Sequence, residues 1–493
     1  MDRPSLRASR KALVLALLVS LVGLSACTAG DYAFGESIAN AISAVIFTEV
    51  CEPVAVPDGA GGVYAAYEKN VQGLARIAYL QRLDADGKPL WPGTGPKIYL
   101  ERVPGYNHLR IPVGELVPTK DGVILVWFLG SRVWAQKVDS AGNLLWGKQG
   151  VKLGISLLPS IGGGPGMLRA VSDGAGGVVI AAYAGPPAGI TLDRLDASGK
   201  SVWSEGRRLA DPSSMPSVGD HLDLASDAAG DFFVWWSRST SWGLQKLNAQ
   251  GEFQWGPEGI TPFPPMSGFS CEHMVADGAG GAFVLCSSQT KDTDSSGKKQ
   301  SALVAQHFDP QGKPLWPESG LVLAIPPEEW HDSAMVPDGA GGAVVAWQQY
   351  GGSVSAQRVN AQGQLLWGDQ SVKVSYGGFL SLAPGHEPGE ALVAWDQSVS
   401  KARNVYVVQF RAQKLSEDGA LVWGPSGMTF TTLEPASGSA PLIVADGEGG
   451  AFVTWTVGGS RGGHHNDTTY IQHIAADGRP LWGAQGIQLT ALR

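Results

Sequence analysis

One phrase recurs eight times in this sequence and limits the possible folds more than any other feature. It consists of a short polar turn, a glycine, three residues and a tryptophan. Successive tryptophans are 55, 57, 52, 61, 51, 56 and 59 residues apart. A period in this range is typical of repeat proteins, whose units share one continuous core. The repeat tryptophans are Trp91, Trp146, Trp203, Trp255, Trp316, Trp367, Trp423 and Trp482.

A second phrase, Asp-Gly-x-Gly-Gly, lies upstream in five repeats and is degraded in the other three. A second large aromatic follows it in six repeats; the third repeat has Ala182 at this position and the fifth has Cys286. Since aromatic rings bury large apolar areas, we interpret both tryptophan sets as packing residues between repeats. The six aromatics are Tyr67, Trp127, Trp236, Trp347, Trp395 and Trp455.

The sixth repeat shows the expected strands most clearly. Its short apolar and β-branched runs cover residues 333–337, 343–347, 354–359 and 364–367, and Gly- and Asn-containing turns separate them. Four antiparallel strands repeated around an axis form a propeller blade. The sequence therefore predicts an all-β chain in which residues 50–493 form one closed eight-bladed β-propeller, with the first strand of each blade innermost.

The N-terminus has the layout of a bacterial secretion signal, a basic start followed by an apolar run. It ends in Leu-Ser-Ala-Cys, which resembles a lipobox and implies acylation of Cys27 and removal of residues 1–26. The alternatives are an ordinary signal peptide or a transmembrane anchor, but the apolar run is shorter than a membrane span requires. We expect anchoring to the lipid bilayer through Cys27, at the outer membrane, facing either the periplasm or the exterior.

Residues 27–49 are the expected tether. Apolar residues at helical spacing predict a short helix over residues 35–47, and a strand over 44–48 added to the last blade is the alternative.

The charge balance excludes one class of partner. The signal carries four of the 36 basic and one of the 45 acidic residues, which leaves 32 basic and 44 acidic residues and a net charge of −12. We therefore expect neither nucleic acid nor an anionic membrane surface as the main partner.

The Gly-x-x-x-Trp turn resembles the tryptophan-docking motif of PQQ-type propellers and, more weakly, the Asp-box of sialidase-type propellers. Closer is the DGxGG and DAxGxxLW repeat of uncharacterised secreted bacterial proteins. In architecture and anchoring, the chain is also similar to the eight-bladed lipoprotein of the outer-membrane β-barrel assembly machinery. These resemblances imply a propeller and say little about activity.

Candidate binding residues concentrate in the variable loops expected on one rim of the ring. Histidines beside carboxylates are suited to metal binding or acid–base chemistry, but ordinary polar loops are the alternative. The candidates are His108, Arg110, His221, Asp223, Glu272, His273, Trp330, His331, Asp332, His464, His465 and Asp467.

No cofactor is predicted. The residues Asp292, Asp294 and Ser296 resemble the start of a calcium loop, but Leu303 stands where a bidentate glutamate is needed. The aspartates in the repeat turns are expected to cap their own turns without a metal.

Cys271 and Cys286 flank the fifth Asp-Gly-Ala-Gly-Gly turn. A two-residue type II′ loop at residues 278–279 would place them opposite each other, where a disulfide is feasible. Two buried free thiols are the alternative, and Cys51 is expected to remain unpaired.

Taken together, these features predict an envelope lipoprotein that acts as a non-catalytic binding scaffold for an unidentified protein or glycan. The alternative is a secreted glycan-acting hydrolase or lyase that uses the His and carboxylate residues of the rim.

Overall fold

The structure is a computed structural model of the 493-residue chain. It describes residues 54–71, 75–102, 114–129, 132–156, 168–183, 189–203, 206–209, 221–238, 241–263, 269–293, 299–325, 330–349, 352–378, 380–402, 405–433, 437–438, 441–458, 460–461, 464–465 and 468–492. The expected signal and tether, with Cys27 and Cys51, lie outside these residues.

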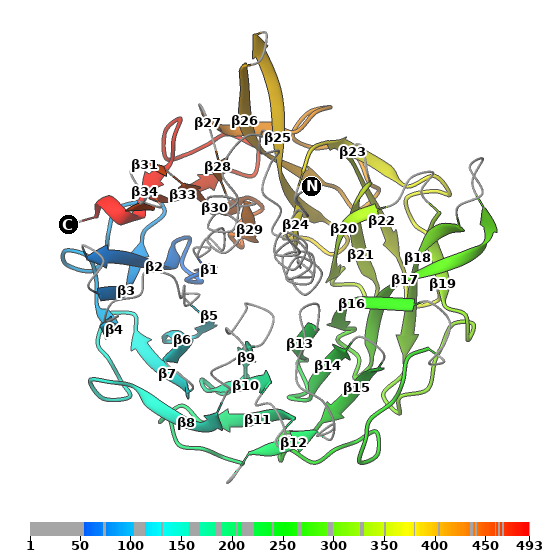
Figure 1. Ribbon diagram of the computed structural model, residues 1–493, viewed down its shortest axis with the longest axis horizontal. Coiled ribbons are helices and arrows are strands. Elements are labelled where there is room, and N and C mark those ends of the chain that lie inside the picture. Colours follow the sequence, from blue (N-terminus) through cyan, green and yellow to red (C-terminus); the bar gives the residue numbers. More distant parts are fainter. Residues whose placement is uncertain are drawn as a thin grey trace, which may run out of the picture.

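The chain forms a ring of eight antiparallel sheets, which confirms the predicted propeller (Figure 1). Within each blade the strands follow one another in chain order from the axis outward, and the first strands of neighbouring blades contact each other around the axis. Among the described residues, no helix is long and apolar enough to cross a membrane.

The first four blades, numbered in chain order, contain the following strands. Blade 1 has β1 (Val54–Pro57), β2 (Val63–Val71), β3 (Ala75–Leu83) and β4 (Lys97–Arg102), and blade 2 has β5 (Glu115–Thr119), β6 (Gly122–Leu129), β7 (Arg132–Asp139) and β8 (Val151–Ser156). Blade 3 has β9 (Leu168–Ser172), β10 (Val178–Tyr183), β11 (Ile190–Leu195) and β12 (Arg207–Leu209), and blade 4 has β13 (His221–Ser226), β14 (Phe232–Arg238) and β15 (Ser241–Leu247). In place of a fourth strand, the described part of blade 4 has an isolated β-bridge between Leu244 and Ile260.

The second half of the ring repeats this pattern. Blade 5 has β16 (Phe269–Ala276), β17 (Ala282–Thr293), β18 (Lys299–Phe308) and β19 (Leu321–Ala324), and blade 6 has β20 (Trp330–Pro337), β21 (Ala343–Gln349), β22 (Ser353–Val359) and β23 (Val372–Tyr376). Blade 7 has β24 (Leu380–Pro384), β25 (Ala391–Ala402), β26 (Val405–Leu415) and β27 (Met428–Leu433). Blade 8 has β28 (Ser437–Gly438), β29 (Leu442–Ala445), β30 (Ala451–Gly458), β33 (Thr468–Ile474) and β34 (Ile487–Gln488), with the ribbon β31 (Ser460–Arg461) and β32 (His464–His465) and the 3-10 helix η2 (Leu489–Ala491).

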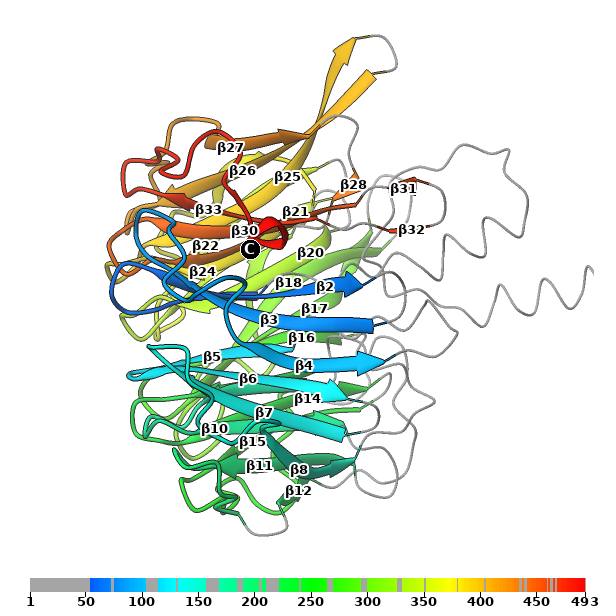
Figure 2. The same cartoon turned by 90° about the vertical axis from the view of Figure 1, so that its left-hand side faces the viewer.

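The two rims of the ring differ. The turns between first and second strands and those after third strands share one rim, on the left in Figure 2, whereas β31 and β32 extend from the other. We call these the turn rim and the loop rim. The repeat-turn aspartates cap their own turns as predicted: Asp84 Oδ1 accepts the backbone N–H groups of Asp86 and Lys88 at 3.0 and 2.8 Å. Asp139, Asp196 and Asp309 do the same.

The predicted fourth strand of the sixth repeat, residues 364–367, is wrong. This segment only bridges back to Val359 through Leu365, and the fourth strand is β23. The chain turns at Gly368, whose φ of +78° favours glycine, before it enters that strand. In the last repeat the fourth strand is the short β34, which η2 follows.

Each repeat tryptophan joins its blade to the next one. Its indole N–H donates to a backbone carbonyl in the corresponding turn of the following blade, at 2.9–3.2 Å. A turn glycine with positive φ packs against the ring; at Gly419 an added Cβ would stand 2.8 Å from Trp367 Cγ. The eight pairs are Trp91–Ser140, Trp146–Ala197, Trp203–Ala249, Trp255–Pro310, Trp316–Ala361, Trp367–Glu417, Trp423–Ala476 and Trp482–Ala85.

A buried glutamine ten residues earlier fixes the backbone of each tryptophan in seven blades. Gln357 Oε1 accepts the backbone N–H of Trp367 at 3.1 Å, and its Nε2 donates to the Gly368 carbonyl at 2.7 Å. In blade 3, Asp193 occupies the equivalent position and accepts the Ser201 hydroxyl. The sequence analysis assigned no role to these glutamines: Gln81, Gln136, Gln245, Gln306, Gln357, Gln413 and Gln472.

The ring closes by packing blade 8 against blade 1. β1 contacts β29, and Trp482 Nε1 donates to Ala85 O at 2.9 Å across 397 residues of sequence. A buried cluster including Tyr67, Phe452 and Leu489 fills this junction. Closure therefore uses the same tryptophan contact as the seven other junctions.

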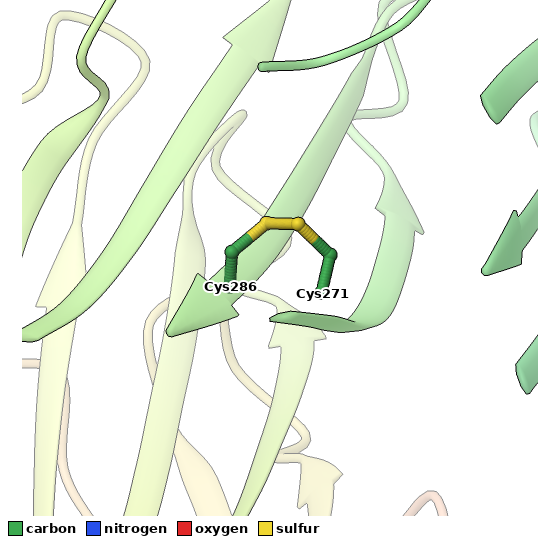
Figure 3. The surroundings of a disulfide bond; sticks show 2 residues. All are labelled: Cys271 and Cys286. Atoms are coloured by element: carbon green, nitrogen blue, oxygen red, sulfur yellow. A yellow bond between two sulfur atoms is a disulfide. The ribbon is translucent and has the colours of Figure 1, made fainter. Parts of the chain in front are cut away.

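A disulfide joins Cys271 of β16 to Cys286 of β17 (Figure 3). The two cysteines are direct partners in the strand register, as expected, but the turn is not the predicted two-residue loop. Three residues lie between Asp277 and Gly281, and the backbone N–H of Asp277 donates to the carbonyl of Gly281 at 3.0 Å. The strand pairing near the turn is therefore shifted by one residue from the predicted register. A bulge between Cys271 and His273 shifts the register back and brings the cysteines face to face.

Peptide mapping checks this connection. Under non-reducing conditions, mass spectrometry is expected to find one linked pair, Cys271 with Cys286, because both side chains are buried and directly opposed. The same digest after reduction is the control. A peptide linked through Cys51, or free thiols at all three remaining cysteines, would contradict the register.

Candidate functional site

The members of the predicted binding rim whose side chains are described lie on first strands, near the axis of the ring. His221 and Asp223 are on β13, His273 is on β16 and Asp332 is on β20. Glu272, Trp330, His331, His464 and His465 are on described strands, but their side chains lie outside the description, as do His108, Arg110 and Asp467 entirely. The calcium candidates Asp292, Asp294 and Ser296 also fall outside the described side chains.

Asp223 belongs to a charged cluster that crosses three blades. Arg169 of β9 lies between Glu115 of β5 and Asp223 of β13, at 3.4 Å from a carboxylate oxygen of each. Arg169 Nη1 also donates to its neighbour's carbonyl, Leu168 O, at 2.9 Å. We call these three residues the axial cluster.

The axial cluster is held in place yet accessible. Asp223 Oδ2 accepts the backbone N–H of Met274 in blade 5 at 3.3 Å, so the contacts extend over four consecutive blades. The side chains of Glu115, Arg169 and Asp223 are 33%, 31% and 24% exposed. A charged group fixed by its neighbours but open to solvent can bind a ligand without a large ordering cost.

The electrostatics of the cluster favour a charged arginine. Burial raises the pKa of Glu115, Arg169 opposes this change, and Asp223 adds to it. For Arg169, burial alone would lower the pKa, but the two carboxylates raise it. The cluster therefore presents one guanidinium between two acidic groups, which suits recognition of polar or charged ligand groups.

Asp332 has a similar interblade contact. Its Oδ2 accepts the backbone N–H of Leu380 in blade 7 at 3.3 Å. Ser381 continues the series, since its hydroxyl donates to Pro441 O at 2.7 Å and accepts the N–H of Ile443 at 3.1 Å. Asp332 thus positions the next first strand, a structural role that its loop-like sequence did not indicate.

Of the six candidate histidines only His221 and His273 have described side chains, so the predicted histidine-rich site stays a prediction. Within the part of the chain that the structure describes, no group of three or more His, Cys, Asp or Glu side chains is placed to hold a metal ion. Sequence reasoning also missed Glu115 and Arg169. The sequence did contain one indication of their role: each is a charged residue in a short, otherwise apolar-rich first strand. A charged side chain that faces inward from such a strand requires an ionic partner.

Asp396 on β25 is a half-buried residue whose carboxyl is only partly compensated. Its Oδ1 is buried and has no hydrogen-bond partner. Burial raises the pKa of Asp396 from its ordinary value of 3.8 to about 6. Because the folded pKa exceeds the unfolded one, the folded state is favoured most below pH 4, and this advantage is lost as the pH rises through 6.

Replacement of Asp396 by asparagine should therefore raise stability at pH 8, by about 1–3 kcal/mol, and change it little at pH 4. Urea unfolding at both pH values measures this difference. Asp86→Asn is the control, since Asp86 is 74% exposed. Equal effects of Asp396→Asn at both pH values would show that its carboxylate is not destabilising.

Comparison with known proteins adds no family. No family model matches the chain, and no curated protein matches it. Similar solved structures include a polysaccharide lyase described as an ulvan lyase, with a TM-score of 0.44, 12% identity, and coverage of 74% of this chain and 92% of that one. A prolyl endopeptidase has a TM-score of 0.44 and 11% identity, covering 96% of this chain and 60% of that one. A protein from Lactobacillus plantarum has a TM-score of 0.39 and 16% identity, covering 70% and 89%. These similarities are too low to indicate a function.

Proposed function

We propose that this protein is a lipid-anchored propeller of the bacterial cell envelope that binds a protein or glycan through the loop rim and axis of its ring. The axial cluster is the observation that carries the binding role. Its guanidinium and two carboxylates come from three blades and remain partly exposed. A rigid ring with fixed charged groups suits recognition, because little conformational entropy is lost when a ligand binds.

The turn rim is the less suitable face for binding. Its aspartates already accept backbone N–H groups of their own turns, and its tryptophans are bonded to the next blade. A ligand on that face would compete with contacts that hold the ring together.

The anchoring part of the proposal rests on the lipobox-like sequence before Cys27. Cys27→Ser should abolish incorporation of labelled fatty acid and leave the protein uncleaved or released from the membrane fraction. Cys51→Ser is the matched control and should keep the label. Acyl labelling that persists in Cys27→Ser would rule out this anchor.

Cross-linking in intact cells tests the binding part. Arg169→Gln removes the central charge of the axial cluster, and Arg479→Gln removes an arginine that is 76% exposed on the turn rim. We expect the same cross-linked protein or glycan with wild type and Arg479→Gln, and its loss with Arg169→Gln. Equal recovery with all three proteins would contradict a role for the cluster, provided that circular dichroism shows Arg169→Gln to be folded.

A glycan-degradation assay separates binding from catalysis. Purified protein is incubated with envelope and extracellular polysaccharides, and new reducing or unsaturated ends are measured. A binding propeller is expected to release none above a heat-denatured control. Turnover that disappears in Arg169→Gln would replace the proposal with a glycan-acting enzyme.

A further inference from the structure

Each blade carries an acid–base pair on the turn rim, which we call its rim pair. The acid lies in or next to the turn between the first and second strands, and the base lies near the end of the third strand, directly after the buried glutamine or Asp193. The pairs are Asp58–Arg82, Asp121–Lys137, Asp173–Arg194, Asp231–Lys246, Asp277–His307, Asp338–Arg358, Glu390–Lys414 and Asp446–His473.

In seven blades the base of the rim pair also bonds to a backbone carbonyl of the following blade. In Arg358, for example, Nε donates a hydrogen bond to Asp338 Oδ2 at 2.8 Å, and Nη1 donates one to the Glu417 carbonyl at 3.1 Å. The other six contacts are Arg82–Ser140, Lys137–Gly176, Arg194–Ala249, Lys246–Gly280, His307–Ala361 and Lys414–Gly449. The rim pairs therefore link blade to blade, next to the tryptophan contacts.

Six of the bases are arginine or lysine, which keep their charge at all physiological pH values, whereas two are histidine. His307 has an oxygen atom at each ring nitrogen: Nε2 is 2.8 Å from Asp277 Oδ2, and Nδ1 is 3.2 Å from the carbonyl of Ala361 in blade 6. A carbonyl oxygen only accepts hydrogen bonds, so Nδ1 must carry a proton to bond to it.

The second nitrogen must carry a proton as well, because Asp277 is an acceptor. Its other oxygen, Oδ1, accepts the N–H groups of Ala279 and Gly281 at 2.7 and 2.8 Å. Burial acts to raise the pKa of Asp277, but the bonds from His307 and these N–H groups lower it overall, which keeps the carboxyl ionised. Only the imidazolium form of His307 donates to both oxygens, of which the Ala361 carbonyl also accepts the Trp316 indole N–H.

Two aromatic side chains, which carry no charge, pack on the ring of His307. Phe283 of β17 stacks on the ring at a centroid distance of 4.0 Å, and Trp316 meets it edge-on at 5.6 Å. Asp277 is the titratable group that pairs with this imidazole. The ring is buried, so water does not replace a lost partner at low cost.

His473 in blade 8 provides an internal contrast. Its Nε2 is 2.9 Å from Asp446 Oδ2, and Phe452 and Trp482 pack on it as their counterparts pack on His307. Its Nδ1, however, has no hydrogen-bond partner. A neutral ring with the proton on Nε2 already makes this contact, so the second proton adds no interblade bond.

We infer that His307 makes the junction between blades 5 and 6 sensitive to pH, because its contact with Ala361 requires the doubly protonated ring. Histidine exchanges this proton in the range of about pH 5 to 8. The contact is present while the ring carries both protons and is lost when a rise in pH removes one of them. The six arginine and lysine rim pairs keep their contacts over the same range, and the loosening is therefore local to one junction.

Hydrogen exchange followed by mass spectrometry tests this inference, with rates corrected for the intrinsic pH dependence. All proteins carry Asp396→Asn, which removes a carboxyl whose pKa is raised to about 6. In that background, the protection of the turn at residues 359–364 against exchange should fall roughly tenfold from pH 6 to pH 8. A change of this size corresponds to the loss of about one hydrogen bond to a charged group.

His307→Arg should remove this pH dependence, because arginine supplies the same two donors at every pH. His473→Arg is the matched control and should leave it unchanged. The inference would be overturned if the protection of this turn did not change with pH in the parent protein, or if it fell equally in His307→Arg. If His307→Arg does not fold, 15N chemical shifts of His307 in the parent decide the matter: a neutral ring at pH 6 would exclude the proposed contact.

Discussion

Replacing Trp367 by alanine is expected to lower the free energy of unfolding by about 3–5 kcal/mol, as large-to-small changes in a core do. The side chain is 7% exposed and packs in the cluster between blades 6 and 7. Its indole N–H bonds to Glu417 O at 2.9 Å, and its ring lies on Gly419. Alanine would remove both contacts and leave a cavity at the junction. Urea unfolding monitored by circular dichroism measures the loss.

Two further variants separate the causes. Trp367→Phe keeps most of the ring and loses the N–H donor, so a cost of about 1 kcal/mol is expected; Glu417 O still accepts a bond from Arg358. Leu366→Ala is the matched control, because the neighbouring Leu366 is 41% exposed. Unchanged stability of Trp367→Ala together with loss of binding would make this tryptophan a recognition residue.

Deleting residues 441–493 should have the largest effect of all, because it removes most of blade 8. The apolar faces of blade 7, around Phe410 and Phe430, and of blade 1, around Tyr67, would then be exposed to water. A ring of seven blades does not close with the geometry of eight, so the product should aggregate or be digested rapidly by protease.

Limited proteolysis and size-exclusion chromatography measure this outcome, with the intact chain treated in parallel. A truncated protein that remains monomeric and keeps full protection of blades 2 to 6 would refute closure. It would show instead that each blade is stabilised only by its immediate neighbours, as in an open repeat protein.

The fold was predictable because its repeat is regular. Gly-x-x-x-Trp marks the same turn eight times, and the glycine and the tryptophan are both needed for the contact between blades. The fourth strand of the sixth repeat was misplaced because Leu365 and Trp367 are apolar and aromatic, like a strand. In fact Trp367 follows a turn and is fixed by Gln357, a long-range role that a local pattern does not show.

The cysteine pairing shows a correct prediction reached through a wrong turn. The expected two-residue loop would have aligned Cys271 and Cys286 directly; the real loop is one residue longer, and a bulge between Cys271 and His273 compensates. Bulges depend on the whole strand pair and are rarely visible in sequence.

The axial cluster and the rim pairs were not predictable from local sequence. Glu115, Arg169 and Asp223 are 54 residues apart in succession and meet only because three first strands converge on the axis. The bases of the rim pairs do follow the glutamine in the repeat, but their partners lie in another turn. The sequence grouped six histidines on one rim; His221 and His273, the two with described side chains, lie on the first strands of neighbouring blades, β13 and β16.

Hydrogen exchange at the junction of the first and last blades tests the closed ring most directly. The contact of Trp482 with Ala85 and the packing of β1 against β29 predict that peptides covering β2 and β30 exchange as slowly as β10 and β21 in the middle of the chain. Fast exchange of both terminal blades, with slow exchange of blades 3 to 6, would contradict the closed ring.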